Sequence, residues 1–293
     1  MIIQNFGGGL GNQIMIYVFA RFLARRNPRQ VMLFDDIFFS LYGTAIDSGY
    51  RLESIFGVQV NFLSTYFNHE IWEDFLSLEK KQALLSPVPR LFYDVGLPMA
   101  VVADRNSYTG FPGLTIFPDQ LASDMWKFPY DNIYCYYSWW TENYWFEQDR
   151  EENRKELTFP RLTDSKNLKY ADQINECDMS VGIHVRRGDH VRLGWSVSAD
   201  KYRSACQKVM DRFPDASFFV FSNEPDWCKA HAGEMGLDLA AHTTFVEEND
   251  SRKDYVDMQL MSMCRGLIHS ETSSFSTVAG WLTRDLEFEV KIK

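Results

Sequence analysis

Residues 1–36 read MIIQNFGGGLGNQIMIYVFARFLARRNPRQVMLFDD. The apolar start at 1–6 predicts a buried strand, and the glycine-rich stretch after it predicts a tight turn. Apolar residues at helical spacing predict a helix over 12–26. The apolar segment 31–34 predicts a second strand. Strand, glycine turn, helix and strand, in this order, begin a doubly wound α/β unit with parallel strands at its centre.

The same alternation returns in the second half of the chain. The pattern predicts strands at 179–185, 217–221, 244–246 and 266–269, and helices at 200–213, 225–235, 251–264 and 273–282. Alternating strands and helices of these lengths indicate a second parallel sheet. The polar stretch 158–165, which contains a proline, lies between the two halves. We therefore expect Rossmann-like domains at 1–160 and 161–293.

The region between these halves is less regular. Helical fragments are predicted at 68–85 and a strand at 132–137. The stretch 86–123 is rich in proline and glycine, which predicts loops or short strands. A charged helix is predicted at 146–157, and its charges indicate a solvated face. The aromatic run 134–146 is typical of a core, with stacking on sugar rings as the alternative.

Charge and composition exclude several classes of function. The formal net charge is −10, whereas non-specific binding to nucleic acid or to an anionic membrane needs a basic face. The five cysteines are scattered and the six histidines lack ligand spacing, so we expect neither disulfides nor a metal site. A basic leader and a run of about 20 apolar residues are both missing, which predicts a cytoplasmic protein without signal peptide or membrane anchor.

Positive charge is concentrated at 184-HVRRGD-189, where a predicted buried strand ends. On an extended strand His184 and Arg186 share one face. Arginine suits phosphate because its planar guanidinium donates two parallel hydrogen bonds. Ligands of doubly wound sheets bind at the carboxyl ends of strands, so the position predicts an oxyanion site. A structural Arg–Asp salt bridge is the alternative.

Hydroxyl groups are concentrated at 270-SETSSFSTVAGW-281, where the last predicted strand ends and a helix begins. The unpaired N–H groups of a helix N-terminus bind phosphate, and Ser273, Ser274 and Ser276 can add hydroxyl donors. A plain N-cap is the alternative, but it accounts for one hydroxyl rather than three.

Two further polar stretches follow predicted strands. GGGLGNQ at 7–13 is neither G-x-G-x-x-G nor a P-loop, so a tight turn and a ligand site are both open. The stretch 222-SNEPDW-227 either reads the base or ribose of a nucleotide or caps the next helix.

Together these stretches resemble glycosyltransferase family 11, the bacterial α-1,2-fucosyltransferases. The similar segments are, in order, GGGLGNQIMIYVFARFLA, VGIHVRRGDH, FFVFSNEPDWCK and DMQLMSMCRGLIHSETSSFSTVAGWL. The second is similar to the H-x-R-R-x-D motif of GDP-fucose-dependent fucosyltransferases. The resemblance implies an α/β, GT-B-like fold of two Rossmann-like domains facing across a cleft. It places the acceptor on the first domain and the nucleotide sugar on the second.

The resemblance also implies a reaction and its residues. L-fucose would pass from GDP-fucose to a galactose 2-hydroxyl of a glycan, lipid-linked glycans included, with inversion and without a metal or other cofactor. Catalytic roles fall on His184, Asn12 and Arg186, which would bind the β-phosphate and offset charge on departing GDP. Donor binding falls on the other motif residues: Arg187, Asp189, Gly9, Gln13, Asn223, Glu224, Ser273, Ser274 and Ser276. Arg187 and Asp189 would also hold their loop.

The sequence departs from the family pattern at several positions. Thr272 replaces an asparagine, Thr277 and Val278 replace two tryptophans, and Asn223-Glu224 replaces two aspartates. The alternatives are therefore a related GDP-sugar transferase of different linkage or donor, and a non-catalytic nucleotide-sugar or glycan binder. A nicotinamide oxidoreductase is remote because G-x-G-x-x-G is missing.

The base and the membrane contact are open at this level. Asp35 and Asp36 are carboxylates that could accept the acceptor's proton, but a loosely bonded transition state needs little help from a base. Without an anchor, we expect at most peripheral contact with the inner face of a membrane.

Overall fold

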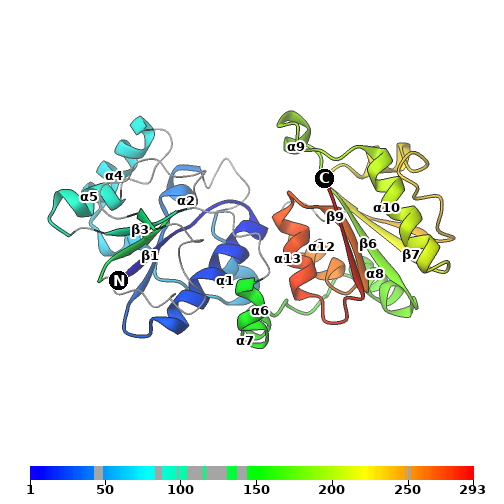
Figure 1. Cartoon of the computed structure of the whole chain (residues 1–293), viewed down its shortest axis with the longest axis horizontal. Helices are drawn as coiled ribbons and strands as arrows, with labels where there is room; N and C mark the ends of the chain where they lie inside the picture. The colour runs from blue at the N-terminus through cyan, green and yellow to red at the C-terminus, as the bar shows by residue number, and fades with distance from the viewer. Residues whose placement is uncertain are drawn as a thin grey trace. The chain divides into compact units, whose positions relative to one another are not determined.

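The computed structural model divides the chain into two compact units, Met1–Thr158 and Phe159–Lys293 (Figure 1). It describes residues 1–42, 49–82, 88–97, 99–103, 115–116, 131–136, 144–247, 249 and 252–293. The boundary between the units lies close to the division at 160 and 161 that the sequence predicts. Each unit is built on a parallel sheet.

The described strands of the first unit form the sheet β2-β1-β5-β3-β4. They are β1 (Ile2–Asn5), β2 (Met32–Asp35), β3 (Ala100–Val102), β4 (Thr115–Ile116) and β5 (Ile133–Cys135). The helices are α1 (Leu10–Arg26), α2 (Ile37–Tyr42), α3 (Leu52–Phe56), α4 (His69–Gln82), α5 (Val88–Asp94), α6 (Tyr144–Gln148) and α7 (Arg150–Glu156), with a 3₁₀ turn η1 (Leu63–Tyr66). β1, α1 and β2 are the strand–helix–strand unit that the first 36 residues predict.

Local geometry requires the glycines between β1 and α1. Gly8 has a φ of 83°, which side chains rarely adopt. Gly7 lies against Phe38, and a Cβ at this glycine would be 2.5 Å from the ring's Cγ. The turn delivers the chain into α1, which packs against α6 through Phe19 and Trp145, with ring centroids 5.2 Å apart.

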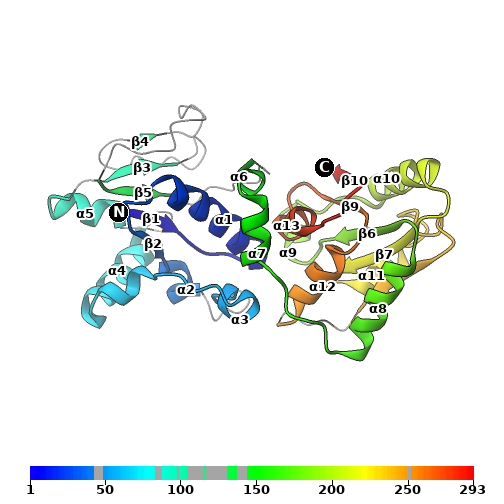
Figure 2. The ribbon, with the colours of Figure 1, turned by 90° about the horizontal axis from the view of Figure 1, so that it is seen from below.

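The described strands of the second unit form the parallel sheet β10-β9-β6-β7-β8. They are β6 (Ser180–Val185), β7 (Ser217–Ser222), β8 (Thr243–Val246), β9 (Gly266–Ser270) and β10 (Phe288–Ile292). The helices are α8 (Ser165–Glu176), α9 (Asp189–Arg192), α10 (Ala199–Arg212), α11 (Pro225–Ala230), α12 (Asp254–Met261) and α13 (Ser274–Leu282). Figure 2 shows α10 and α12 on opposite sides of this sheet. β6 lies at its centre and is buried along its whole length, so the motif that follows β6 starts from a fully buried strand.

Alternate residues of β6 serve the two faces of this sheet. Val181, Ile183 and Val185 belong to the core beneath α10 and α11. Gly182 and His184 point to the other face, where a Cβ at Gly182 would be 2.9 Å from Leu267. The absence of a side chain at 182 therefore lets the α12 and α13 side pack closely on the sheet.

The structure differs from the sequence predictions in several elements, and α2, α3, η1 and α9 were not predicted. α5 lies in the stretch 86–123, predicted as loops or short strands, while 86–87, 98, 104–114 and 117–123 of that stretch lie outside the described residues. The charged helix at 146–157 is two helices, α6 and α7, that meet at Asp149. Neither α8 nor β10 was predicted. α8 is capped by Asp164, whose carboxylate accepts from the backbone of residues 166 and 167.

The described strand β5 covers part of the strand predicted at 132–137, and residues 137–143 of the aromatic run lie outside the described part. Of that run, Trp145 and Phe146 are buried, which agrees with the core interpretation. Within the described ranges, the helices are too short or too polar to cross a bilayer.

Candidate functional site

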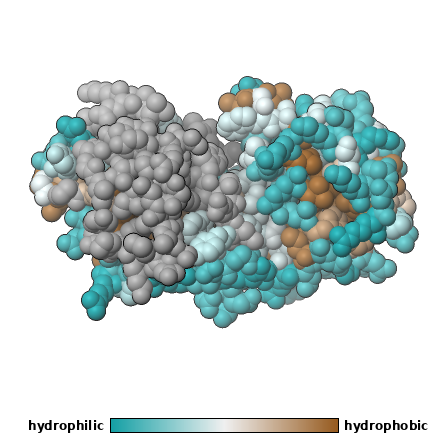
Figure 3. All heavy atoms as spheres, viewed as in Figure 1, coloured by the Kyte–Doolittle hydropathy of each residue, from teal (hydrophilic) through white to brown (hydrophobic). Residues whose placement is uncertain are grey.

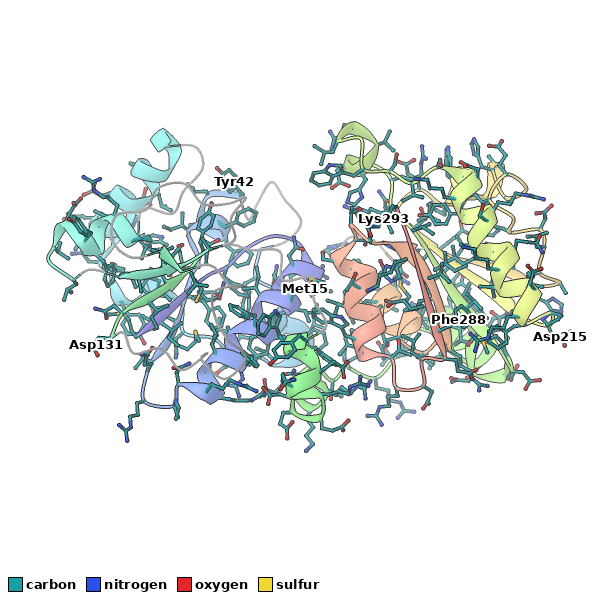
Figure 4. The ribbon with its side chains drawn as sticks, in the orientation of Figure 1. Met15, Tyr42, Asp131, Asp215, Phe288 and Lys293 are labelled. Carbon is teal, nitrogen blue, oxygen red and sulfur yellow. The ribbon has the colours of Figure 1, made fainter. Side chains whose placement is uncertain are left out.

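The candidate site lies at the carboxyl edge of the second sheet. Parallel strands end at one edge, so residues 186–189, 223–224 and 271–273 follow β6, β7 and β9 on the same side. In Figure 4, Phe288 marks the amino end of β10 and Lys293 follows its carboxyl end. The carboxyl edge is therefore the upper edge of this sheet in that view, on the side of α9.

Residues after β7 hold the loop after β6. Arg187 Nε donates to Glu224 Oε2 at 2.9 Å, and the backbone N–H of Gly188 donates to Glu224 Oε1 at 2.8 Å. The backbone N–H of Arg187 donates to Asn223 Oδ1 at 2.9 Å. The guanidinium carbon of Arg187 lies 3.6 Å from the centroid of the Trp227 ring. The hydrogen bond from Arg187 lowers the pKa of Glu224, so this pair is ionised at neutral pH.

These contacts revise the roles expected for two residues. Both Glu224 carboxylate oxygens and the Asn223 amide oxygen are occupied by the loop. Both side chains brace the loop that carries Arg186, and the contact with the donor expected for them stays a prediction. Arg187 has the loop-holding role expected for it.

Arg186 presents its guanidinium at the end of the central strand. One terminal nitrogen lies 2.8 Å from Asp189 Oδ1, and 36% of the arginine side chain is exposed. An ion pair through one nitrogen leaves other N–H groups of the guanidinium for a ligand. The salt bridge and the oxyanion site, which the sequence left as alternatives, are therefore compatible.

His184 lies beneath the N-terminus of α13. Its Nδ1 is 3.1 Å from Ser276 Oγ and 3.4 Å from Ser273 Oγ. Both serines are buried, so their hydroxyls position the imidazole instead of serving as the open phosphate donors we expected. Ser274, the first residue of α13, is partly exposed and keeps that expected role open.

His184 is a neutral imidazole at neutral pH. Burial lowers its pKa to about 3, and the neighbouring charges of His269, Arg186 and His190 add to this effect. A neutral ring has one N–H donor and one acceptor nitrogen. His184 can therefore donate or accept a hydrogen bond but adds no charge of its own.

In the first unit, Gln13 clamps backbone. Its Nε2 donates to the carbonyl oxygens of Gly8 and Gly49, each at 2.9 Å, and its Oε1 accepts from the backbone N–H of Arg51 at 3.0 Å. Both amide hydrogens are used, and the side chain is fully buried. Gln13 therefore has a structural role in this turn, and the donor-facing role expected for it stays a prediction.

Gly9 is the N-cap of α1 and Asn12 lies in the first turn of this helix, in the segment that follows β1. The Asn12 amide lies over Gly8, since a Cβ at Gly8 would be 2.7 Å from Nδ2. A Cβ at Gly9 would meet no atom within 4 Å. Their roles toward a ligand stay predictions.

The two candidate bases are held by structural contacts. Asp35 accepts from the Tyr134 hydroxyl at 2.7 Å and from the backbone N–H of Ile37 at 3.1 Å. Asp36 accepts from the Ser64 hydroxyl at 2.6 Å and from the Ser64 backbone at 3.0 Å. Both carboxylates thus fix the chain after β2.

Sequence reasoning missed a carboxylate near this edge of the second sheet. Asp257 lies in the first turn of α12, after the loop that follows β8, and its Oδ1 accepts from Asn249 Nδ2 at 2.6 Å. Asn249 also pairs with Asn167 of α8 at 3.1 Å. The signal was Asp257 itself, at the start of the motif DMQLM. Burial raises its pKa to about 7.

The raised pKa of Asp257 predicts a pH-dependent stability. Between its unfolded value, 3.8, and about 7, the folded protein binds a proton that the unfolded chain does not, so stability falls as pH rises through this window. We expect Asp257→Asn to be more stable than wild type at pH 8, by on the order of 2 kcal/mol, and equal to it near pH 3.5. Denaturant unfolding at both pH values measures this. A difference of the same size at both would contradict it.

The described residues contain no group of three or more His, Cys, Asp or Glu that could hold a metal ion. That the reaction needs no metal ion stays a prediction, and a chelator can test it.

Each of the two units is built on a parallel sheet, and the chain has the GT-B-like fold of the solved fucosyltransferase structures described below. Residues 116–291 match the model of the family described as Glycosyl transferase family 11. Because this match covers more than half of the chain, the protein belongs to that family, and the resemblance seen in its motifs is confirmed.

Individual proteins are similar over nearly the whole chain. An α-1,2-colitosyltransferase of Escherichia coli is 25% identical over 96% of this chain and 87% of its own length. The O-antigen biosynthesis glycosyltransferase WbnK of E. coli is 24% identical, over 97% and 90% respectively. The fucosyltransferase NodZ from Bradyrhizobium shares the fold, with a TM-score of 0.52 at 14% identity and coverage of 95% and 91%. NodZ, an α-1,6-fucosyltransferase, was also co-crystallized with GDP; that structure gives a TM-score of 0.51 at 14% identity, covering 96% of this chain and 92% of NodZ.

Proposed function

We propose that the protein transfers L-fucose from GDP-fucose to the 2-hydroxyl of a galactose in a glycan acceptor, with inversion at the sugar. The observation that carries this proposal is the half-exposed Arg186 guanidinium, held at the end of β6 by a loop that Glu224 braces. GDP bound to NodZ, a protein of the same fold, supports a guanosine diphosphate leaving group. The second unit would bind the nucleotide sugar and the first unit the acceptor.

The chemistry matches this arrangement. As the bond to the sugar breaks, negative charge grows on the diphosphate and the sugar becomes oxocarbenium-like. A preorganised guanidinium stabilises that charge without rearranging during the reaction. Arg186 would meet the β-phosphate, the free N–H groups at the start of α13 would meet the same diphosphate, and His184 would add one neutral hydrogen bond.

The acceptor's proton has no assigned base. Asp35 and Asp36 are occupied by structural partners, so we do not assign either. An oxocarbenium-like transition state draws the acceptor oxygen in late and needs little base help, which is consistent with transfer without a dedicated carboxylate.

A second donor is favoured by one relative. Colitose is L-fucose without its 3-hydroxyl group, and an α-1,2-colitosyltransferase is 25% identical to this chain. Because the diphosphate and guanosine parts would be the same, Arg186 and α13 do not separate GDP-fucose from GDP-colitose. The group that meets C3 of the sugar decides between them.

Direct assay tests the proposal. We expect GDP release from GDP-fucose in the presence of galactose-terminated oligosaccharides. EDTA should not change the rate, because Arg186 and the start of α13 would offset the charge of the leaving group without a metal ion. The same assay with GDP-colitose tests the second donor, and linkage analysis of the product tests the 2-hydroxyl. If folded protein binds GDP but transfers neither sugar to any acceptor of a broad panel, the protein is a nucleotide-sugar binder and not a transferase. Loss of activity with EDTA, restored by Mg²⁺, would reject the metal-independent route.

Contact with a membrane stays a prediction, and the structure offers one apolar segment where such contact could occur. Val191, Leu193 and Trp195 are 44%, 55% and 50% exposed on α9 and the turn after it. Figure 3 shows brown, apolar surface at this end of the second unit. A lipid-linked acceptor would meet this apolar segment beside the arginine loop.

A further inference from the structure

An asparagine at the carboxyl edge of the first sheet has one half of its amide held and the other half unpaired. Asn5 is the last residue of β1 and is partly exposed. Its Nδ2 donates to the Tyr134 hydroxyl at 3.1 Å and to Asp35 Oδ2 at 3.4 Å. Its Oδ1 has no hydrogen-bond partner among the residues that the structure describes. The protein therefore holds the nitrogen of this amide and leaves the oxygen as an acceptor without a donor.

The direction of these hydrogen bonds fixes the orientation of the amide. A carboxylate only accepts, so the Tyr134 hydroxyl donates its one proton to Asp35 Oδ2, at 2.7 Å, and accepts from Asn5. Turning the amide over would place Oδ1 against the carboxylate. Oδ1 is therefore presented in one orientation, as an acceptor for an O–H or N–H group of a ligand.

The same carboxylate also positions α2. Asp35 Oδ1 accepts from the backbone N–H of Ile37, the first residue of this helix, at 3.1 Å. The helix carries Phe38 and Tyr42 four positions apart, which places them on the same side of it. Their ring centroids are 5.3 Å apart. Asp35 thus holds both Asn5 and the helix that carries the two rings.

This aromatic pair, Phe38 and Tyr42, lies beside the glycine turn that follows β1. The Phe38 ring packs on the backbone of Gly7, where a Cβ would clash with it. Tyr42, labelled in Figure 4, is 42% exposed, and its hydroxyl has no hydrogen-bond partner in the described part of the chain. Phe39 instead packs on the buried Phe6, with ring centroids 5.5 Å apart. One side of α2 therefore joins the core, while the other presents aromatic surface at the carboxyl edge.

We propose that Asn5 and this aromatic pair form the site for the terminal sugar ring of the acceptor. Small-molecule sites combine apolar and aromatic surface with a few precisely placed polar groups. A galactose ring has one face of C–H groups, which the aromatic pair would cover, and hydroxyls, one of which would donate to Asn5 Oδ1. Phosphate oxygens are acceptors, so a diphosphate has no donor to offer this atom. The inference rests on the proposed transfer to galactose.

The aromatic part is tested by steady-state transfer with lactose as the acceptor. We expect Tyr42→Ala to raise KM for lactose roughly three- to tenfold with kcat unchanged, because contact with the ring stabilises the ground state and the transition state equally. Tyr42→Phe keeps the ring and should stay within about twofold of wild type. The matched control is Tyr93→Ala, because Tyr93 is 49% exposed on α5, which precedes the amino end of β3. Equal KM values for Tyr42→Ala and Tyr93→Ala would reject the aromatic surface.

The polar part is tested with 3-, 4- and 6-deoxygalactosides. We expect wild type to show a KM roughly tenfold higher for one of these than for the parent galactoside, because Asn5 Oδ1 loses its donor. Asn5→Ala should treat all of them alike. Tyr134→Phe, a milder change that removes the hydroxyl holding the amide, should weaken the same discrimination. A merely structural Asn5 would change the melting temperature and not this pattern, so unchanged discrimination in both variants overturns its role.

Failure of this site and failure of the proposed function give different results. Saturation-transfer NMR with methyl β-galactoside measures sugar binding without turnover. If Tyr93→Ala binds the galactoside like wild type and Tyr42→Ala binds it more weakly, but no sugar is transferred, the sugar site stands and the proposed reaction is rejected. If fucose is transferred to lactose with the same KM in all variants, the reaction stands and the site is rejected.

Discussion

Arg186→Ala is expected to lower kcat/KM for sugar transfer by roughly 100- to 1,000-fold, the usual effect of removing one donor from a site where charge develops in the transition state. The side chain is half-exposed and its one protein partner is Asp189 among the contacts described above, so the variant should melt within about 1 °C of wild type. Initial rates of GDP release over a range of GDP-fucose concentrations measure the effect.

Arg192→Ala is the matched control for this variant. Arg192 is an exposed arginine at the end of α9, and its removal changes the net charge by the same amount. We expect its kcat/KM to stay within about twofold of wild type, because salt screens the charge of an exposed side chain. Equal losses in the two variants would mean that general charge, and not the position of Arg186, drives catalysis.

Gly188→Ala is expected to have the second-largest effect. Gly188 has φ 58° and ψ −109°, a turn conformation dominated by glycine, and a Cβ there would be 2.6 Å from Asn223 Nδ2. The strain should destabilise the protein by about 1–3 kcal/mol. The clash should push Asn223 off the loop and displace Arg186, lowering kcat/KM by about 100-fold.

Gly194→Ala separates strain from displacement. Gly194 also has a positive φ, 71°, but a Cβ there meets no atom within 4 Å. We expect a loss of stability from the backbone strain with little change in kcat/KM. If both alanine variants lose activity equally, the brace from Asn223 and Glu224 does not set the position of Arg186.

The sequence predicted best those strands and helices whose apolar pattern is not interrupted by polar residues. The bounds of β6 and the start of α13 were predicted within one residue. An apolar run that is followed by glycine or by hydroxyl residues is typical of a buried strand that ends at a turn or at a helix start. β10 was missed because FEVKI is a short edge strand whose alternate residues are charged. α8 was missed because polar residues outnumber its buried Tyr170, Ala171 and Ile174.

The site shows the same limit. Proximity in sequence predicted that Arg186, Arg187 and Asp189 lie together. Which of these side chains form hydrogen bonds within the protein depends on residues that follow other strands. Glu224 faces Arg187 across 37 positions, and Ser276 faces His184 across 92. Sequence alone therefore grouped residues that brace the loop with residues that are expected to bind a ligand.

The loop brace, the buried imidazoles and the α13 start all lie within Phe159–Lys293, while the Gln13 clamp and the Asp35 and Asp36 contacts close within Met1–Thr158. The two halves are therefore separable for engineering. With the acceptor on the first unit, as we propose, mutagenesis of the first 158 positions is expected to change acceptor preference and to leave in place the residues that we assign to leaving-group departure.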